Sequence, residues 1–156
     1  MCAIIDSNVR DELVKKNPSA IGLHFRKWLS DRKGKLVVGG KLLEELQEST
    51  AVKQWIASRI QAGIVDHIED REVDIKADEI KGQCRSNDPH IVALARVSGA
   101  RLLYTADRDL MGDFRNKNLL GGRVRGRIYN ANVDRNTLSK THKSLLNRVD
   151  LCVSNR

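Results

Sequence analysis

The sequence predicts an α/β fold in which helices cover both faces of a mainly parallel sheet. Short apolar segments that resemble buried strands alternate along the chain with segments of helical periodicity, and this order is typical of a three-layer α/β/α arrangement. The chain has 156 residues, of which 40% are hydrophobic and 4% aromatic, so aliphatic side chains must build its core. A chain of this length fits one domain with one core.

The first half of the chain contains three expected strands and the helices between them. Three short apolar runs are the expected strands, at residues 2–6, 36–38 and 64–68. Pro18 opens a segment with apolar residues at helical spacing, which ends near Gly34. Residues 41–61 are also helical in pattern, with a break near residues 49–50. Each of the first two expected strands is thus followed by a helix.

The second half continues the alternation. Residues 73–84 have the pattern of a polar-faced helix. Asp88 and Pro89 form a helix start, with the acid at the cap and the proline at the first helical position, and this helix stops at Gly99. The remaining expected elements are a strand at residues 101–105, a short helix at 107–114, a strand at 127–129 and a helix at 138–149.

The net charge of +8 is concentrated at one end of the chain. Residues 115–156 contain ten Lys and Arg against two Asp, whereas residues 1–114 are balanced. A basic end of this kind suits a polyanion, because each phosphate that is neutralised releases counterions. The alternative is a solvated surface without a partner. The scarcity of aromatic residues argues against a platform on which single-stranded bases stack.

The cysteine pattern and the apolar runs bear on the compartment. Cys2, Cys84 and Cys152 are an odd, widely spaced trio, which argues against a disulfide framework or a structural zinc site and for a reducing compartment. No charged leader precedes the first expected strand, and the longest apolar run, residues 91–95, is too short to cross a bilayer. The sequence therefore predicts a cytoplasmic protein that does not insert into a membrane.

Four acidic residues lie at or near the ends of the expected strands, namely Asp6, Glu45, Asp88 and Asp107. In an open parallel sheet, ligands bind beyond the carboxyl ends of the strands, where the strand order reverses. If the first and fourth strands are neighbours at that point, Asp6 and Asp107 lie side by side. Asp88 and Asp107 could instead be ordinary helix caps, whereas an acid that ends a buried strand, such as Asp6, needs a partner or a cation.

A cluster of these acids has a definite chemistry. Crowded carboxylates repel one another, so the cluster needs a cation to stay ionised. Oxygen ligands without a nearby Cys or His pair favour Mg²⁺ or Mn²⁺ over zinc. Such an ion can orient and deprotonate a water molecule for attack on a phosphodiester, and a second ion can stabilise the leaving oxygen. The acids thus indicate a metal-dependent hydrolase.

Three segments resemble motifs of one family, the PIN-domain nucleases. IIDSN at residues 4–8 is similar to the family's opening motif, in which Asp-Ser/Thr-Asn follows an apolar strand. NDPHIVALA at residues 87–95 resembles the helix that carries the family's third acid. LLYTADRDL at residues 102–110 is similar to the segment in which Asp-x-Asp-Leu follows a strand. The order and spacing of the three motifs agree with the family over roughly residues 2–130.

The resemblance implies a PIN-like fold with a five-stranded, mainly parallel sheet in residues 1–130, and Mg²⁺- or Mn²⁺-dependent cleavage of RNA. It implies that the catalytic and metal-binding residues are Asp6, Glu45, Asp88 and Asp107. Glu45 is preferred to its neighbour Glu44 because the family usually places an apolar residue after this acid, here Leu46. Residues 131–156 continue past the usual end of the family, and we expect a basic, helical extension packed on the same domain.

The resemblance also bears on partners. Many small PIN proteins are the toxins of toxin–antitoxin pairs, so an antitoxin-like inhibitor protein and a homodimer are candidate partners beside the RNA substrate. Three alternating arginines of a Gly-rich segment are expected to contact RNA, namely Arg123, Arg125 and Arg127.

Several further residues have candidate roles around the acids. The candidate donors that would orient the acids are Ser7, Asn8 and Thr105, although ordinary turns use the same residue types. Asp109 and Asp113 are expected to be exposed helix charges, although Asp109 is placed to approach a metal. We expect His90 to be a surface or helix-start residue rather than a ligand.

Two other functions are compatible with the pattern. A phosphatase of the haloacid dehalogenase type would use Asp6 as nucleophile on a similar sheet. Such enzymes place a second Asp two residues later, where this chain has Asn8. The other alternative is a PIN-like domain that binds RNA without cleaving it. The four acids argue against such a decayed site, but they do not establish activity.

Overall fold

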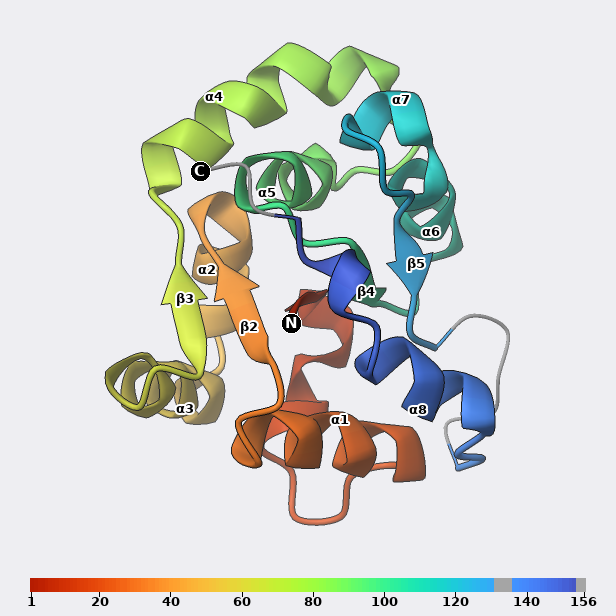
Figure 1. Cartoon of the computed structure of the whole chain (residues 1–156). Coiled ribbons are helices and arrows are strands. Elements are labelled where there is room, and N and C mark those ends of the chain that lie inside the picture. The colour runs from red at the N-terminus through yellow and green to blue at the C-terminus, as the bar shows by residue number, and fades with distance from the viewer. Residues whose placement is uncertain (131–135, 154–156) are drawn as a thin grey trace.

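A single sheet of five parallel strands forms the centre of the computed structural model, which describes residues 1–130 and 136–153. The strands are β1 (Cys2–Ile5), β2 (Lys35–Val38), β3 (Val65–His67), β4 (Leu102–Tyr104) and β5 (Arg127–Ile128). Their order across the sheet is β3-β2-β1-β4-β5, and every neighbouring pair is parallel (Figure 1). The predicted fold class is therefore confirmed.

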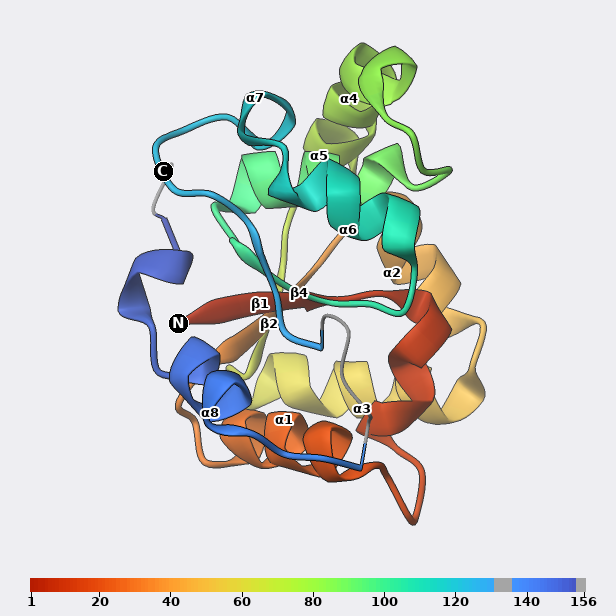
Figure 2. The ribbon, with the colours of Figure 1, turned by 90° about the vertical axis from the view of Figure 1, so that its right-hand side faces the viewer.

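Helices cover both faces of this sheet. The α-helices are α1 (Ala20–Ser30), α2 (Gly40–Gln47), α3 (Thr50–Gln61), α4 (Asp70–Ile80), α5 (Pro89–Ser98), α6 (Arg108–Arg115), α7 (Lys117–Leu120) and α8 (Lys140–Leu146). Short 3₁₀ helices are η1 (Ser7–Leu13), η2 (Lys81–Gln83) and η3 (Val149–Leu151). Figure 2 shows α4, α5, α6 and α7 on one face and α1, α3 and α8 on the other. Helix α2 packs against α3, α4 and α5.

Local sequence explains where helix α1 begins and where helix α5 ends. Helix α1 starts after Ser19, whose side chain accepts a hydrogen bond from the Gly22 backbone N–H, so the helix begins two residues beyond Pro18. Helix α5 ends at Gly99, which has φ of 84°. A Cβ atom there would lie 1.5 Å from the carbonyl oxygen of Val153, so only glycine allows both the turn and the approach of the chain end.

The core is mainly aliphatic, with a small aromatic cluster between the sheet and α1. The rings of Tyr104 and Tyr129 contact Phe25 at centroid distances of 5.2 and 5.4 Å. The Tyr129 hydroxyl donates a hydrogen bond of 2.8 Å to the carbonyl of Ile21, which ties the end of β5 to α1. Burial raises the pKa of the Tyr129 hydroxyl far above its usual range, so it stays protonated as a donor.

The described part of the C-terminal extension packs across the amino end of the sheet. Arg101 donates its backbone N–H to the Leu151 carbonyl at 2.8 Å, and Val153 donates to Gly99 at 2.8 Å. The indole N–H of Trp28 donates to the carbonyl of Leu146 at 2.8 Å, so α8 is joined to α1. The predicted extension at residues 131–156 lies partly outside the described residues.

One expectation about the cysteines is wrong. Cys2 and Cys152 form a disulfide across 150 residues of sequence, and Cys84 is free. The spacing of the cysteines along the sequence could not predict this pairing, because Cys2 and Cys152 come together only when β1 and the end of the chain lie at the same edge of the sheet. The cysteines therefore no longer support a reducing compartment. Among the described residues, no helix is both long and apolar enough to span a bilayer.

Candidate active site

The strand order brings two of the acids together. Ile5 of β1 is paired in register with Tyr104 of the adjacent strand β4, and the Asp6 backbone N–H donates to the Tyr104 carbonyl at 2.9 Å. Asp6 follows β1 directly and Asp107 lies just beyond β4, so both are at the carboxyl edge of neighbouring parallel strands, as predicted. This is also the point where the order of the sheet reverses, since β1 has β2 on one side and β4 on the other.

A threonine hydroxyl joins these two acids. Thr105 is fully buried, and its Oγ1 donates a hydrogen bond of 2.7 Å to Asp6 Oδ2. The same oxygen accepts the backbone N–H of Asp107 at 3.0 Å. The Thr105 backbone N–H in turn donates to Asn130 Oδ1 at 3.1 Å. Thr105 thus orients Asp6, and Asn130, which the sequence analysis did not single out, holds the strand end in place.

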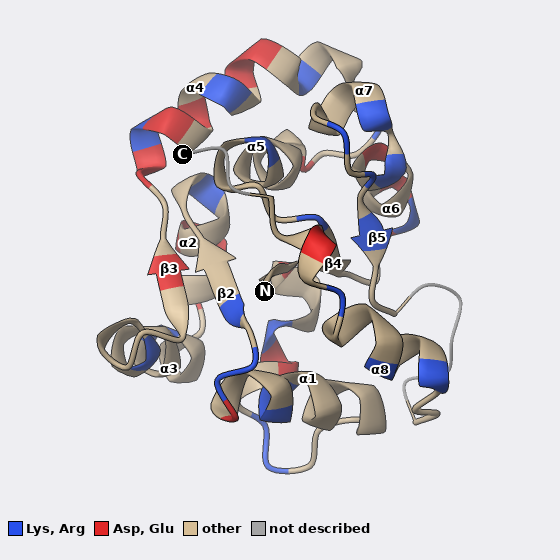
Figure 3. Ribbon diagram, in the orientation of Figure 1, with Lys and Arg blue, Asp and Glu red and all other residues tan. Residues whose placement is uncertain are grey.

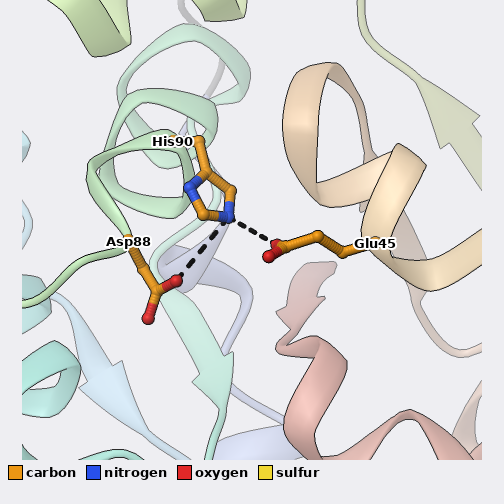
Figure 4. Close-up of side chains that lie close together, drawn as sticks. All are labelled: Glu45, Asp88 and His90. Carbon is orange, nitrogen blue, oxygen red and sulfur yellow. Dashed lines mark hydrogen bonds and ion pairs between the residues drawn. The ribbon is translucent and has the colours of Figure 1, made fainter.

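Glu45 and Asp88 reach the same edge from α2 and from the start of α5. Between them lies the imidazole of His90, whose Nε2 is 2.7 Å from Glu45 Oε1 and 3.8 Å from Asp88 Oδ1 (Figure 4). Of the two adjacent glutamates, Glu45 is the partly buried one, whereas Glu44 is exposed. Of the two alternatives expected for His90, the structure shows a helix-start residue and not a surface residue, because His90 lies in the first turn of α5 and is only 2% exposed.

The loop before Asp88 is held by another acid. Asp113 accepts the backbone N–H groups of Arg85 at 3.0 Å and Ser86 at 2.9 Å. It is 4% exposed, so the expectation of a solvated helix charge is wrong. The apolar face of α6 could have signalled this burial, since Asp113 follows Leu110 at the three-residue spacing of one helix face. Asp113 therefore fixes the approach of the chain to Asp88.

Helix capping explains Asp107 but not Asp88. The Asp107 carboxylate accepts the backbone N–H groups of Asp109 at 2.9 Å and Leu110 at 3.2 Å, as an N-cap of α6. Asp88 makes no capping hydrogen bond through its side chain to α5, whose first residue is Pro89. The position of Asp88 before a proline therefore does not account for its carboxylate, which is directed toward His90 and Glu45.

Burial and neighbouring acids raise the pKa of two of the four acids, Asp6 and Asp88. Burial raises the pKa of Asp6, the hydrogen bond from Thr105 opposes this shift, and the charge of Glu45 adds to it. The pKa of Asp88 is raised by burial first and then by the charges of Asp6, Glu45 and Asp107, while His90 lowers it. The neighbouring acids are therefore close enough to disfavour the ionised forms of Asp6 and Asp88.

The donor set fits a divalent cation. Ligand atoms of Glu45, Asp88 and His90 all lie within 4.8 Å of one another, and Asp6 and Asp107 supply further carboxylate oxygens at the same edge. A cation would favour the ionised form of Asp88, whose pKa is raised by burial and by the charges of the neighbouring acids. An oxygen-rich set of this kind suits Mg²⁺ or Mn²⁺. Asp109 is exposed in the first turn of α6, beside Asp107.

Two further candidates surround Asp6. Asn8 follows it in η1, and its Oδ1 accepts the backbone N–H of Ala106 at 3.4 Å, across to the segment after β4. The backbone of Ser7 donates a hydrogen bond to Asp6 that lowers the pKa of this acid. These contacts tie the two chain segments that follow β1 and β4.

The three candidate RNA-binding arginines lie elsewhere. Arg123, Arg125 and Arg127 are exposed, and Arg127 is paired in register with Leu102 at the start of β4. They are therefore at the amino end of the sheet, and the structure does not bring them together with the acids. Lys and Arg also occur along α6 and α7, which lead from the acid edge toward this segment (Figure 3).

Comparison of the chain with protein-family models, with curated proteins and with solved structures finds no match. The class that the structure defines is an α/β protein with a five-stranded parallel sheet and an acidic cluster at its switch point. Any assignment of function to this chain rests on the chemistry of that cluster.

Proposed function

We propose that this protein is an endoribonuclease of the PIN type, which uses Mg²⁺ or Mn²⁺ to hydrolyse RNA at Asp6, Glu45, Asp88 and Asp107. The single observation that carries the proposal is geometric: Glu45 and Asp88 offer carboxylate oxygens within 4.8 Å of each other, at the edge where Asp6 and Asp107 follow the adjacent parallel strands β1 and β4. Four carboxylates from four separate elements thus share one edge of the sheet, at the place where open α/β sheets bind ligands.

The roles of the residues follow from their contacts. A divalent cation held by these carboxylates would supply a Lewis acid that activates water and neutralises charge at the phosphodiester. Thr105 fixes the rotamer of Asp6 through its 2.7 Å hydrogen bond, so that one oxygen of Asp6 remains for the cation. The backbone of α6 fixes Asp107 in the same way.

The placement of the three motifs supports the PIN assignment. IIDSN covers β1 and the start of η1, NDPHIVALA covers the beginning of α5, and LLYTADRDL covers β4 and the start of α6. Each of the three motifs therefore carries one of the acids at the carboxyl edge of the sheet. RNA as the substrate is supported by the basic residues of the second half of the chain, and an antitoxin-like inhibitor and a homodimer remain part of the proposal.

The phosphatase alternative fits less well. Such an enzyme would use Asp6 as the nucleophile and a second acid, two residues later, as the general acid. The second residue after Asp6 is Asn8, whose side-chain oxygen is engaged by the Ala106 backbone. A general acid for the leaving group is therefore absent from that position.

The proposal is tested by incubating the protein with RNA while Mn²⁺ or Mg²⁺ is titrated, beside a parallel assay on p-nitrophenyl phosphate. We expect internal RNA cleavage that depends on the cation and stops in EDTA, and no phosphatase activity. RNA binding without cleavage at any cation concentration would favour the inactive RNA-binding alternative. Release of p-nitrophenol without RNA cleavage would favour the phosphatase.

Adjacent glutamates provide a matched pair of variants. Glu45→Gln should lower the RNA cleavage rate on the order of 100-fold, because it removes a charge that the cation needs. Glu44→Gln makes the same change one residue earlier on α2, at an exposed position, and should leave the rate unchanged. Equal effects of the two substitutions would count against the acid site as proposed.

A further inference from the structure

We propose that His90 is a positioning residue for Glu45: its Nε2–H holds the Glu45 carboxylate in the acid site, and the imidazole does not itself bind the cation. The proposal rests on the proposed metal site. It adds a residue that is not one of the four acids, and it assigns to the imidazole one of two roles that its position would allow.

Two of the other acids, Asp6 and Asp107, each have a hydrogen-bond donor that fixes the carboxylate. Thr105 donates to Asp6, and the backbone of α6 donates to Asp107. Glu45 has a longer side chain with more rotatable bonds, so it loses more conformational entropy when it is fixed. The hydrogen bond that fixes its carboxylate among the described residues is the 2.7 Å contact with His90 Nε2.

The position of the imidazole favours this role. His90 lies in the first turn of α5, and its ring is 2% exposed, so the helix and the surrounding core restrict its rotation. The Nε2 edge faces Glu45 and Asp88, while the other ring nitrogen points away from both acids (Figure 4). Helices α2 and α5 pack against each other, so a rigid donor on α5 sets the position of a flexible acid on α2.

The second ring nitrogen distinguishes a donor from a metal ligand. Nδ1 of His90 is buried and has no hydrogen-bond partner within residues 1–130 and 136–153. A neutral ring with its proton on Nε2 donates to Glu45 and leaves only a lone pair at Nδ1. A ring that bound a cation through Nε2 would carry its proton on Nδ1, where a buried N–H would lack an acceptor. Metal-binding histidines almost always give that proton to a partner.

The first experiment measures Mn²⁺ binding to the full chain by calorimetry, without RNA. His90→Leu removes the donor, and we expect it to weaken Mn²⁺ binding about 10- to 100-fold, as loss of a partner that orients a ligand does. His90→Gln can place an amide N–H near the position of Nε2, so it should stay within about threefold of the wild type. An unchanged affinity of a folded His90→Leu protein would overturn the proposal.

Two controls separate positioning from packing. His142→Leu removes an equally buried imidazole from α8, on the other face of the sheet, and should leave Mn²⁺ affinity unchanged. If His90→Leu does not fold by circular dichroism, His90→Asn replaces it, because its shorter side chain does not reach Glu45. His90→Asn should then bind Mn²⁺ more weakly than His90→Gln, and equal affinities would overturn the proposal.

A double-mutant cycle tests whether His90 acts through Glu45. In a Glu45→Gln background, His90→Leu should have little further effect on Mn²⁺ affinity, since the carboxylate that it positions is gone. Additive losses would show an independent role and overturn the proposal. The ratio of Mn²⁺ to Mg²⁺ affinity should also be the same in wild type and His90→Leu. A shift toward Mg²⁺ in the variant would identify a nitrogen ligand instead.

Different experimental results would overturn this inference and the proposed function. A wild-type protein that binds no Mn²⁺ and cleaves no RNA would overturn both. A wild-type protein that binds Mn²⁺ and cleaves RNA, with a His90→Leu variant of equal Mn²⁺ affinity, would overturn only the role of His90.

Discussion

The two ends of the sheet bury charge in different ways. At the amino end, Arg101 is 1% exposed, and its guanidinium donates hydrogen bonds to the backbone carbonyls of Ala95, Ala100, Gly121 and Val124. At the carboxyl end, burial and the charges of neighbouring acids raise the pKa of Asp6 and Asp88, and the imidazole of His90 lies between Asp88 and Glu45. Backbone carbonyls thus satisfy the guanidinium of Arg101, whereas the proposed function gives the acids a divalent cation from outside the chain.

Other segments of the chain also cover the two ends of the sheet to different extents. The last described residues of the chain pair with Gly99 and Arg101 and are bonded through Cys152 to Cys2, so the amino end is covered. The acid end lies at η1, which follows β1, and at the starts of α5 and α6. Stability and function are thus expected to respond to different substitutions.

The largest expected effect is at the acid end. Asp6→Asn keeps the shape of the side chain and the acceptor for Thr105 but removes the charge that a cation needs. We expect RNA cleavage to fall on the order of 1000-fold, which corresponds to the several kcal/mol that a bound cation contributes. Circular dichroism should show an unchanged fold. A folded variant with full activity would remove Asp6 from the site.

The next largest expected effect is a loss of stability when the disulfide at the amino end of the sheet is removed. Cys152→Ser breaks the bond to Cys2, and we expect the free energy of unfolding to fall by about 2–4 kcal/mol, because the open chain gains entropy when it unfolds. Urea unfolding in the absence of reductant measures the loss, with Cys84→Ser as the control at the free cysteine. Cleavage per folded molecule should stay the same. A parallel loss of cleavage would show that the two ends are coupled.

A smaller effect is expected for RNA affinity. Replacement of Arg123, Arg125 and Arg127 by Gln should weaken RNA binding and reduce its salt dependence by up to about three units of slope, roughly one per lost phosphate contact. Cleavage at saturating RNA should change much less, since these arginines are at the other end of the sheet from the acids. Binding is measured over a series of salt concentrations.

The same arginines have a competing role within the protein. The pKa of Asp150 is lowered mainly by its bond to Arg148 and to a smaller extent by the charge of Arg127. An unchanged salt slope in the triple variant would mean that these arginines serve such internal pairs, and RNA would then approach the acids from another side.

The smallest effect is the dependence of stability on pH. Burial and neighbouring charges raise the folded-state pKa of Asp6 and Asp88 above the value of 3.8, so their ionised forms destabilise the folded protein. This destabilisation is complete above the raised pKa values and disappears as the pH falls to the unfolded value. The double variant Asp6→Asn with Asp88→Asn should therefore be more stable than wild type at neutral pH in EDTA.

The greater stability of the double variant relative to the wild type should shrink as the pH is lowered toward about 4. Urea unfolding of both proteins over this range measures it, and only the difference between them is compared because other acids titrate in both. Mn²⁺ should reverse the order at neutral pH by stabilising the wild type alone. A difference that does not change with pH would mean that neither acid is perturbed by the fold.

Local patterns in the sequence were sufficient to predict the strands of the sheet. The apolar runs of β1, β2 and β4 and the helix start at Pro89 were predicted within a few residues, because strand and helix formation depend on periodicity over a short span. The helix α7 was missed, since four residues are too few to show a period. The positions of Asp6 and Asp107 at strand ends followed directly from the strands.

Contacts between distant segments required the tertiary structure. The rotation of α2 decides that Glu45 rather than Glu44 is directed toward the other acids, and packing of α5 decides that His90 is buried. The pairing of Cys2 with Cys152 and the distance of Arg127 from the acid edge also depend on which strand ends meet. The sequence by itself thus determined the elements and the acids at their ends, because both are local properties. Only the fold decided which side chains share an environment, because burial and partners come from segments far apart in the chain.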